Sequence, residues 1–253
     1  MNPPDPSAPD LKSLLQRLKL NSLLERHEEL ARQAIEQRWS HLTYLEHLIA
    51  GECLDRQHRL VERRILAARF NVIKTLDQFE WDWPDKINEA QIRNIFRLGF
   101  IEKKSNVIFM GTCGTGKSHL AVALAYQACQ RGHAVLYSTA IEALNRLVAA
   151  QAAHRLRAEL RRYLAPRVVV LDEIGYLPLD KVGADLMYQL ISQRYEQGSL
   201  ILTTNKKYKR WAEIFNGDAG ITSAILDRVL HNAETVTIEG KSYRMKGQGV
   251  SAA

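Results

Sequence analysis

Two different hydrophobic patterns divide the chain near residue 105. From about residue 10 to residue 70 the apolar residues recur at spacings of three and four with no proline, which predicts helices. One face of such a helix is apolar and carries Leu42, Leu45, Ile49 and Cys53. From residue 106 onward, short apolar runs alternate with longer helical segments, and this alternation is typical of an α/β protein with a parallel sheet.

The second half can be divided into expected elements. We expect strands at residues 106–110, 134–138, 167–171 and 199–203, and helices at residues 120–130, 141–150 and 182–195. The run RVVVL at 167–171 indicates a strand buried on both faces, and Asp180 is placed to cap the helix that follows. Between the two halves, the proline, acids and tryptophans of 79–89 indicate a loop that leads into a helix at 89–98.

These patterns predict how the chain is organised. We expect a disordered lead-in at residues 1–10, a small all-α N-terminal domain at 11–80, an α/β domain at 81–246 and a tail at 247–253. With 46% hydrophobic and 25% charged residues, the composition is that of a globular protein. The sequence has no membrane-length apolar run, no signal-peptide pattern and no CxxC pair among its three cysteines. We therefore expect a cytoplasmic protein without a membrane partner, a disulfide framework or a zinc site.

The segment from Gly111 to Ser118 carries the strongest chemical signal. It reads GTCGTGKS and matches GxxxxGK[ST], the P-loop, between an expected strand and an expected helix. Glycines at 114 and 116 let backbone N–H groups turn toward phosphate oxygens at a helix N-terminus, which is already biased positive. Lys117 would place its ammonium on the β- and γ-phosphates, and the Ser118 hydroxyl would be a ligand of Mg²⁺.

We therefore expect a nucleotide to contact the whole P-loop and the residue after it. These residues are Gly111, Thr112, Cys113, Gly114, Thr115, Gly116, Lys117, Ser118 and His119. The Cys113 thiol has no chemical task there, because the loop binds phosphate through its backbone.

Two carboxylates follow the strand at 167–171. Asp172 would sit at the carboxyl end of that strand, where it can hold Mg²⁺ through water. Glu173 is then placed to polarise an attacking water as general base, and this second carboxylate suggests hydrolysis rather than binding alone. The structural alternative is a pair of acids that merely terminates a strand.

The run LILTTN ends in a third polar residue, Asn205. A strand that ends this way can lie between the other two and orient the lytic water or touch the γ-phosphate. A GTPase reading competes, since Asp172 to Gly175 fits DxxG and Asn205-Lys206 begins NKxD. The guanine-reading acid would then be residue 208, which is Tyr208, and a phenol cannot accept the paired hydrogen bonds that a carboxylate takes from guanine. The sequence therefore favours adenine.

The basic residues are unevenly distributed. The formal net charge is +7, and residues 106–253 hold 18 Lys and Arg against 12 Asp and Glu. Such clusters bind nucleic acid phosphates in a salt-dependent way, although a solvated surface is the alternative for any run of charge. We expect DNA contact, through phosphates more than bases, at two clusters: Arg155, Arg157, Arg161 and Arg162, and Lys206, Lys207, Lys209 and Arg210.

Two further arginines lie near the end of the chain. Arg228 is expected on a helix beyond the strand at 199–203, where it is either an arginine finger for a neighbouring subunit or an ion-pair partner of Asp227. Arg244, in the run SYR, is a second candidate for contact with the γ-phosphate.

With these residues in view, the chain from about Leu11 to Lys246 resembles the IstB family of the AAA+ superfamily. These proteins are ATP-dependent helpers of insertion-sequence transposons and are close to the DnaC helicase loaders. The resemblance is carried by GTCGTGKSHLA, VVVLDEIGYLPLD, LILTTNK and AILDRVLHNAETVTIEGKSYR. By position, it implies Walker A roles for Lys117 and Ser118, Walker B roles for Asp172 and Glu173, sensor 1 for Asn205, the arginine finger for Arg228 and a sensor-2-like role for Arg244.

The resemblance implies a P-loop AAA+ fold, ATP and Mg²⁺ as cofactors, and an ATPase stimulated by DNA and oligomerisation. It also implies homo-oligomers that assemble on duplex DNA in a bacterial cytoplasm. These oligomers would select a target and recruit or activate a separate transposase. Only nine residues follow Arg244, so no C-terminal helical lid is expected, and IstB and DnaC proteins share that lack. Two alternatives stay open: a DnaC-like replicative helicase loader, and a nucleotide-dependent binding module, against which Glu173 argues.

Overall fold

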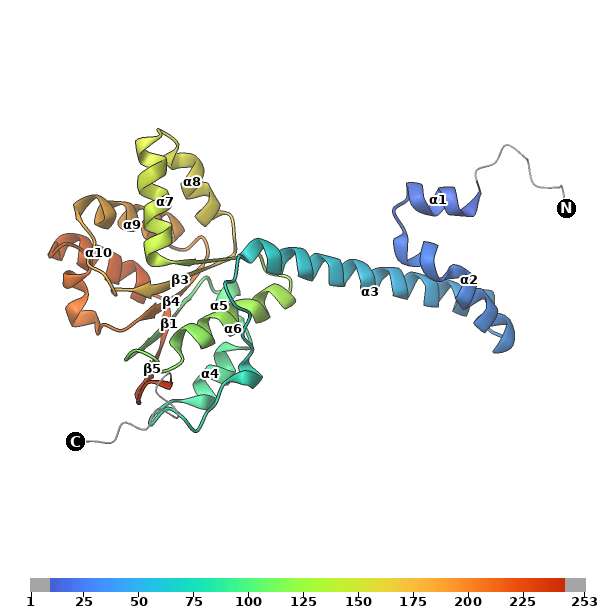
Figure 1. Cartoon of the computed structure of the whole chain (residues 1–253), viewed down its shortest axis with the longest axis horizontal. Helices are drawn as coiled ribbons and strands as arrows, with labels where there is room; N and C mark the ends of the chain where they lie inside the picture. The colour runs from blue at the N-terminus through green and yellow to red at the C-terminus, as the bar shows by residue number, and fades with distance from the viewer. Residues whose placement is uncertain (1–9, 244–253) are drawn as a thin grey trace. The chain divides into compact units, whose positions relative to one another are not determined.

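The computed structural model describes residues 10–243, and within them the chain divides into two compact units between Arg63 and Arg64 (Figure 1). The expected tail, Arg244 and all but the last residue of the expected lead-in lie outside the described residues. In the described part, no helix is long and apolar enough to cross a membrane.

Unit 1 is helical, as the sequence predicts. It contains α1 (Leu11–Arg17), α2 (Asn21–Glu36) and most of α3 (His41–Ala68). Its small core is formed by Leu15, Leu23 and Leu48. The buried carboxylate of Glu52 accepts a hydrogen bond from the backbone N–H of Ser22 and pairs with two arginines of its own helix, Arg56 at 2.8 Å and Arg59 at 3.4 Å.

The apolar face predicted for this helix is solvent-exposed. Leu42, Leu45 and Ile49 are 65%, 51% and 46% exposed, and the neighbouring Cys53 is exposed as well. These four residues form what we call the α3 stripe.

The two units meet between Arg63 and Arg64, whereas the sequence predicts a domain boundary between residues 80 and 81. Residues 64–80 pack on unit 2, because Ala68 and Phe79 are buried in its core and Phe70 and Leu76 lie against it. The helical periodicity of α3 continues through the boundary, so the hydrophobic pattern alone could not place it.

Unit 2 is built on five parallel strands. They are β1 (Asn106–Gly111), β2 (Val135–Thr139), β3 (Val168–Ile174), β4 (Ser199–Thr204) and β5 (Ala233–Ile238), in the order β2-β3-β4-β1-β5. Ile201 of β4 lies opposite Val107 on one side and Val170 on the other. The expected fold class, a P-loop parallel sheet flanked by helices, is confirmed.

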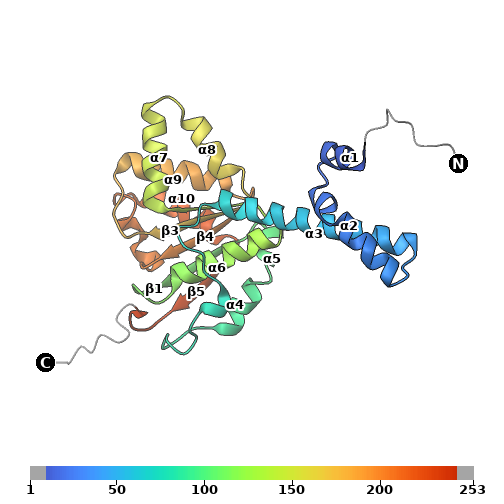
Figure 2. The same cartoon turned by 45° about the vertical axis from the view of Figure 1, so that its right-hand side comes forward.

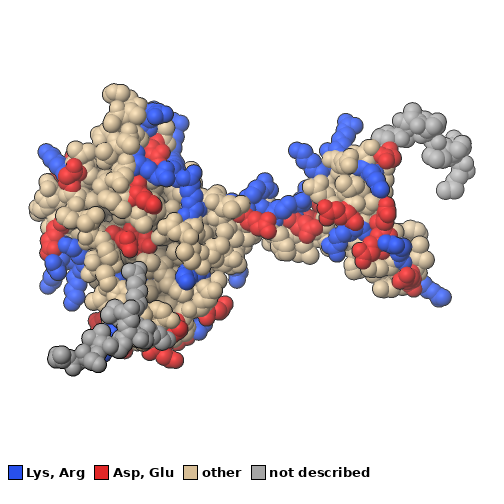
Figure 3. All heavy atoms as spheres, viewed as in Figure 1, with Lys and Arg blue, Asp and Glu red and all other residues tan. Residues whose placement is uncertain are grey.

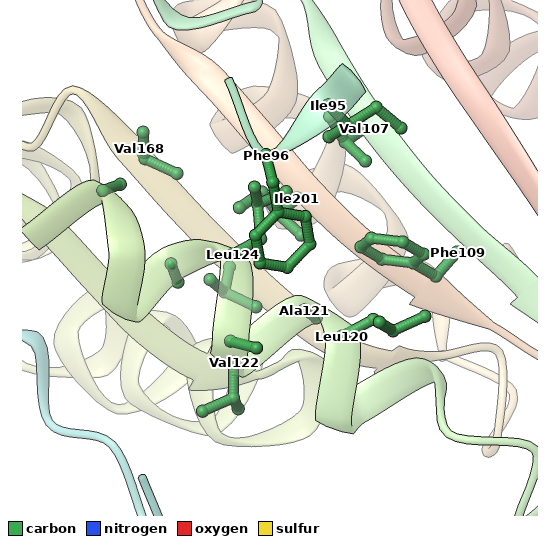
Figure 4. Packing of buried hydrophobic residues seen from close by; sticks show 14 of the residues in the cluster. Ile95, Phe96, Val107, Phe109, Leu120, Ala121, Val122, Leu124, Val168 and Ile201 are labelled. Carbon is green, nitrogen blue, oxygen red and sulfur yellow. The ribbon is translucent and has the colours of Figure 1, made fainter. Parts of the chain in front are cut away.

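Helices cover both faces of the sheet (Figures 1 and 2). One face packs with α4 (Glu89–Ile95), α5 (Gly99–Glu102) and α6 (Lys117–Gln130), and the other with α7 (Ala140–Ala152), α8 (Leu156–Leu164), α9 (Lys181–Arg194) and α10 (Ala219–Leu230). Residues alternate between the two cores along each strand, with Phe109 on the first face and Ile108 on the second. Figure 4 shows Leu124 of α6, Phe96 and Ile201 packed together on the first face.

Every strand and helix expected in the second half is present to within a few residues. Asp180 caps α9 by accepting the backbone N–H of Gly183 at 2.8 Å, as predicted. The structure also contains elements that the hydrophobic pattern did not predict: α5, α8, β5 and two 3₁₀ turns, η1 (Leu76–Gln78) and η2 (Tyr208–Glu213). Strand β5 is an edge strand with a polar, half-exposed beginning, and the arginines of α8 obscure its apolar spacing.

Candidate nucleotide site

The carboxyl ends of three neighbouring strands bring the predicted motifs together. Strand β1 ends at Gly111, where the P-loop begins, and α6 starts at Lys117. Strand β4 lies between β1 and β3, as expected. Because all strands are parallel, these groups lie at one edge of the sheet.

The P-loop has the backbone geometry of an anion cradle. Gly114 and Gly116 have φ values of +76° and +92°, a region that side chains disfavour. A Cβ at Gly116 would also come within 2.5 Å of the Phe79 ring, so glycine is required there on two grounds. The ammonium of Lys117, which is only 4% exposed, donates to the carbonyl oxygen of Thr112 within the loop. Successive N–H groups at a helix N-terminus, together with this cation, suit phosphate oxygens.

Three hydroxyl groups converge on the buried carboxylate of Asp172. Ser118 Oγ donates to Oδ1 at 2.9 Å, Tyr137 Oη donates to Oδ2 at 2.8 Å, and Thr203 Oγ1 also donates to Oδ1. Burial and the charge of Asp172 raise the pKa of Tyr137, so the phenol stays a neutral donor. Of the three donors, only Ser118 was expected at this position.

This donor set fits a magnesium ion that is bound together with a nucleotide. Mg²⁺ prefers hard oxygen ligands and is held by one or two protein groups plus phosphates and water. The Ser118 hydroxyl and the Asp172 carboxylate supply such groups beside the phosphate cradle. In residues 10–243 no cluster of three or more His, Cys, Asp or Glu side chains could hold a metal by itself.

Glu173 adopts a left-handed backbone conformation, with φ +64°. The pairing of β3 with β4 is irregular between Leu171 and Ile174, and the Glu173 N–H donates to Thr203 Oγ1 at 2.8 Å. A non-glycine residue in this region costs about 1–3 kcal/mol and persists where its surroundings hold it. The Thr203 hydroxyl therefore fixes both carboxylate residues, by donating to Asp172 and accepting from Glu173.

The P-loop and Glu173 line a cavity of about 460 Å³, which is of the size that small-molecule sites have. Gly114 to His119 form one wall, with Glu173 and Tyr176 beside them. The His119 ring donates from Nε2 to the carbonyl oxygen of Thr75 at 2.8 Å and meets Phe79 edge to face. Burial lowers the pKa of His119, which keeps the ring neutral at pH 7.

The rest of the lining comes mainly from a segment that was predicted partly as the end of the helical N-terminal domain and partly as a loop. It comprises Ile73, Lys74, Gln78, Phe79, Glu80, Trp83 and Pro84, with Tyr243 from the far end of the chain. No local motif marked these residues. The only signal was the concentration of aromatic residues at 79–83.

Two of the predicted site residues, Cys113 and Asn205, are solvent-exposed. Cys113 is exposed, and its Sγ lies 3.3 Å from the hydroxyl of Tyr176. Asn205 follows the last residue of β4 and is exposed, and no hydrogen bond of its side chain is found within residues 10–243. The polar side chain of this strand that reaches the carboxylates is Thr203, two residues earlier.

Arg228 lies near the amino ends of the strands, away from the P-loop. It shares a small cavity with Asn106 and Leu200, at the amino ends of β1 and β4, and does not line the nucleotide cavity of its own chain. Its guanidinium sits 5.3 Å from the centre of the Tyr188 ring and donates to the carbonyl oxygen of Ala224 at 2.8 Å. The alternative ion pair with Asp227 is absent from the ion pairs of the described residues.

The two basic clusters differ in how far acids compensate them. On α8, Arg155, Arg157 and Arg161 are exposed, and Arg162 pairs with Glu159 at 3.4 Å. Figure 3 shows Lys and Arg side chains gathered over this part of unit 2.

In the second cluster, Lys206 and Arg210 both bind Glu213 at 2.7 Å. Hydrogen bonds from Arg210 and Lys206 lower the pKa of Glu213 to about 2. Lys207 and Lys209 are exposed. The α8 cluster is therefore the less compensated of the two.

Comparisons with known sequences agree with this geometry. A sequence family described as IstB-like ATP binding protein matches residues 13–251. A protein of Pseudomonas aeruginosa, named for ATP binding and for insertion sequence IS21, is 39% identical over 237 residues, which cover 94% of this chain and 89% of that protein. A counterpart of insertion sequence IS5376 in Geobacillus stearothermophilus is 35% identical over 230 residues, covering 91% of each chain.

Solved structures support the fold. DnaI aligns with a TM-score of 0.54 at 19% identity, over 70% of this chain and 91% of that one. The DnaC helicase loader aligns with a TM-score of 0.53 at 20% identity, over 65% and 96% of the two chains. At this level of identity the likeness concerns the fold alone.

Proposed function

Since this chain belongs to the family of IstB-like ATP-binding proteins, we propose that it is a DNA-binding AAA+ ATPase that assists transposition of an insertion sequence. In this proposal ATP orders a homo-oligomer on duplex DNA in the bacterial cytoplasm, and the assembly selects a target and recruits or activates a separate transposase. The observation that carries the ATPase part is that Ser118 and Glu173 line the P-loop cavity and that Ser118 contacts the Asp172 carboxylate.

Each residue of the site has a separate task in hydrolysis. The P-loop N–H groups and Lys117 hold the phosphates in place. Ser118 and Asp172 would hold Mg²⁺, which when bound neutralises charge on the β- and γ-phosphates. Glu173 takes the proton of the attacking water, and its left-handed backbone aims the carboxylate into the cavity. Thr203 keeps Asp172 and Glu173 in position.

An oligomer would complete the site. Arg228 lies at the edge of the sheet opposite its own P-loop, so it can act as an arginine finger only on a neighbouring subunit. The contact with Tyr188 holds the guanidinium in place beforehand. The α3 stripe is an apolar surface that a neighbouring subunit or the transposase would cover.

The DNA contact is assigned first to α8. Its exposed arginines can each neutralise one phosphate, whereas two members of the 206–210 cluster are engaged with Glu213. Phosphate contacts position a protein on DNA without reading its sequence, which suits a helper that accepts many targets.

Light scattering after gel filtration tests the assembly. The full chain is run with a non-hydrolysable ATP analogue and short duplex or single-stranded DNA, with Lys117→Ala as the control that stays small throughout. Large particles that require both nucleotide and duplex are the expected result. Assembly on single strands alone would favour a helicase loader instead, and particles that stay small with either DNA would contradict the DNA-binding part.

A further inference from the structure

The chain that follows β5 lies directly on the P-loop. Thr112 Oγ1 donates to the carbonyl oxygen of Gly240 at 3.1 Å, and the backbone N–H of Tyr243 donates to the carbonyl oxygen of Gly114 at 2.8 Å. A Cβ at Gly114 would come 2.0 Å from the hydroxyl of Ser242. Residues 240–243 are thus packed against the phosphate cradle with no space between them.

The same segment is joined to the loop at residues 80–84, which also lines the cavity. Trp83 Nε1 donates to the carbonyl oxygen of Lys241 at 3.1 Å, and the Tyr243 hydroxyl donates to the Glu80 carboxylate. The rings of Trp83 and Tyr243 meet edge to face, with centroids 5.5 Å apart. These partners are 158 and 163 residues apart in sequence.

A backbone ladder supports this junction from behind. Lys86 and Glu239 exchange two backbone hydrogen bonds, of 3.1 and 3.0 Å. Gly240 fits against the next turn, where a Cβ would come 3.0 Å from the backbone nitrogen of Asp85. The two segments are therefore held together independently of the side chains that face the cavity.

Glu80, Trp83 and Tyr243 all line the nucleotide cavity. We propose that they form a clasp that retains the bound nucleotide, with the Tyr243–Glu80 hydrogen bond as its closure. The inference rests on the proposed function in one respect, namely that the ligand of this cavity is a nucleotide. The backbone ladder anchors the two arms, and the side-chain contact between them opens when the nucleoside leaves.

The clasp affects the release of the nucleotide rather than the hydrolysis step. Its residues lie on the wall formed by 80–84 and 243, whereas Asp172, Glu173 and Thr203 belong to the strand ends. Weakening the closure should raise the dissociation rate of the nucleotide and the KM for ATP more than it lowers kcat. Tyr243 is 43% exposed, so water can replace part of the lost bond, and we expect about a three- to ten-fold faster release.

Stopped-flow release of a fluorescent mant-ATP analogue from the full chain tests the clasp. Tyr243→Phe removes the donor to Glu80 and keeps the ring against Trp83, and it should release the analogue faster by the factor given above. Glu80→Gln keeps a side-chain acceptor and should stay near the wild-type rate. Tyr44→Phe, which removes a hydroxyl that donates to the His27 carbonyl in unit 1, is the matched control.

The outcomes separate the clasp from the proposed function. If the wild-type chain bound no analogue, nucleotide binding itself would fail. If it bound the analogue and Tyr243→Phe released it at the rate of Tyr44→Phe, the clasp alone would be overturned. Thermal melts of the variants show whether Tyr243→Phe is folded, and a misfolded variant is replaced in the test by Glu80→Ala, which removes the acceptor and makes the same prediction.

Discussion

Replacing Thr203 by valine isolates the hydroxyl that connects the two carboxylate residues. Thr203 is fully buried, and valine keeps its shape while removing the donor to Asp172 and the acceptor for the Glu173 N–H. A hydrogen bond to a charged group contributes about 1.5–3 kcal/mol, and an unpaired buried N–H costs about 1–3 kcal/mol. Because water can reach the exposed Glu173, we expect the free energy of unfolding to fall by about 2–4 kcal/mol.

The effect on catalysis follows from the backbone of Glu173. Without its acceptor, the left-handed conformation at φ +64° loses the contact that holds it, and the general base leaves its position. If about 1.4–2.8 kcal/mol of that loss appears in the transition state, turnover at saturating Mg·ATP falls roughly 10- to 100-fold. Urea unfolding and phosphate release measure the two quantities separately.

Thr204 provides a matched control within the same strand. It is also fully buried and its hydroxyl accepts one backbone N–H, from Lys206 at 3.2 Å, but it does not touch Asp172 or Glu173. Thr204→Val should therefore lower stability by about 1–2 kcal/mol and leave turnover near wild type. Equal turnover in the two valine variants would refute the role given to Thr203, and Thr203→Ser should restore activity.

Three further predictions concern the base, the DNA surface and the fold. Glu173→Gln should bind ATP normally while phosphate release falls roughly 10²- to 10⁴-fold, and unchanged turnover would remove Glu173 from the mechanism. Arg157→Gln with Arg161→Gln should reduce the slope of log affinity against log salt for duplex DNA by about 0.9 per residue, measured by fluorescence anisotropy, whereas Arg210→Gln should change it less because Glu213 already pairs with that side chain. Arg194 is 1% exposed and donates to the carbonyl oxygens of four residues, so Arg194→Met should lower the free energy of unfolding by about 3 kcal/mol or more in urea titrations.

Local sequence was sufficient for the parts of the site that lie within one strand–loop–helix unit. The P-loop and the strand that carries Asp172 could be predicted because glycine spacing and a β-branched run are read over a few neighbouring residues. The position of β4 between β1 and β3 was also expected, whereas the positions of β2 and β5 in the sheet were not predicted.

A comparison of Thr203 with Asn205 shows where this reasoning stops, because a role was predicted for Asn205 and none for Thr203. Both are short polar residues near the end of one strand, and two residues apart they would face the same side in a regular strand. Strand β4 ends at Thr204, so Asn205 no longer follows the pleat, and its side chain is exposed. The irregular pairing between Leu171 and Ile174 then turns the Glu173 N–H toward Thr203. A bulge of this kind depends on the register of two strands and is not written in either one alone.

The wall of the cavity failed to be predicted for a different reason. Its two arms lie more than 150 residues apart in sequence, and each is short and without periodicity. The arms meet because β5 pairs with β1 and thereby brings residue 240 back to the P-loop. Strand β5 itself was missed, since an edge strand with a polar beginning lacks the buried run that marked the others. Once that strand is placed beside β1, the contact of residues 240–243 with the P-loop follows, and so does the need for glycine at position 114.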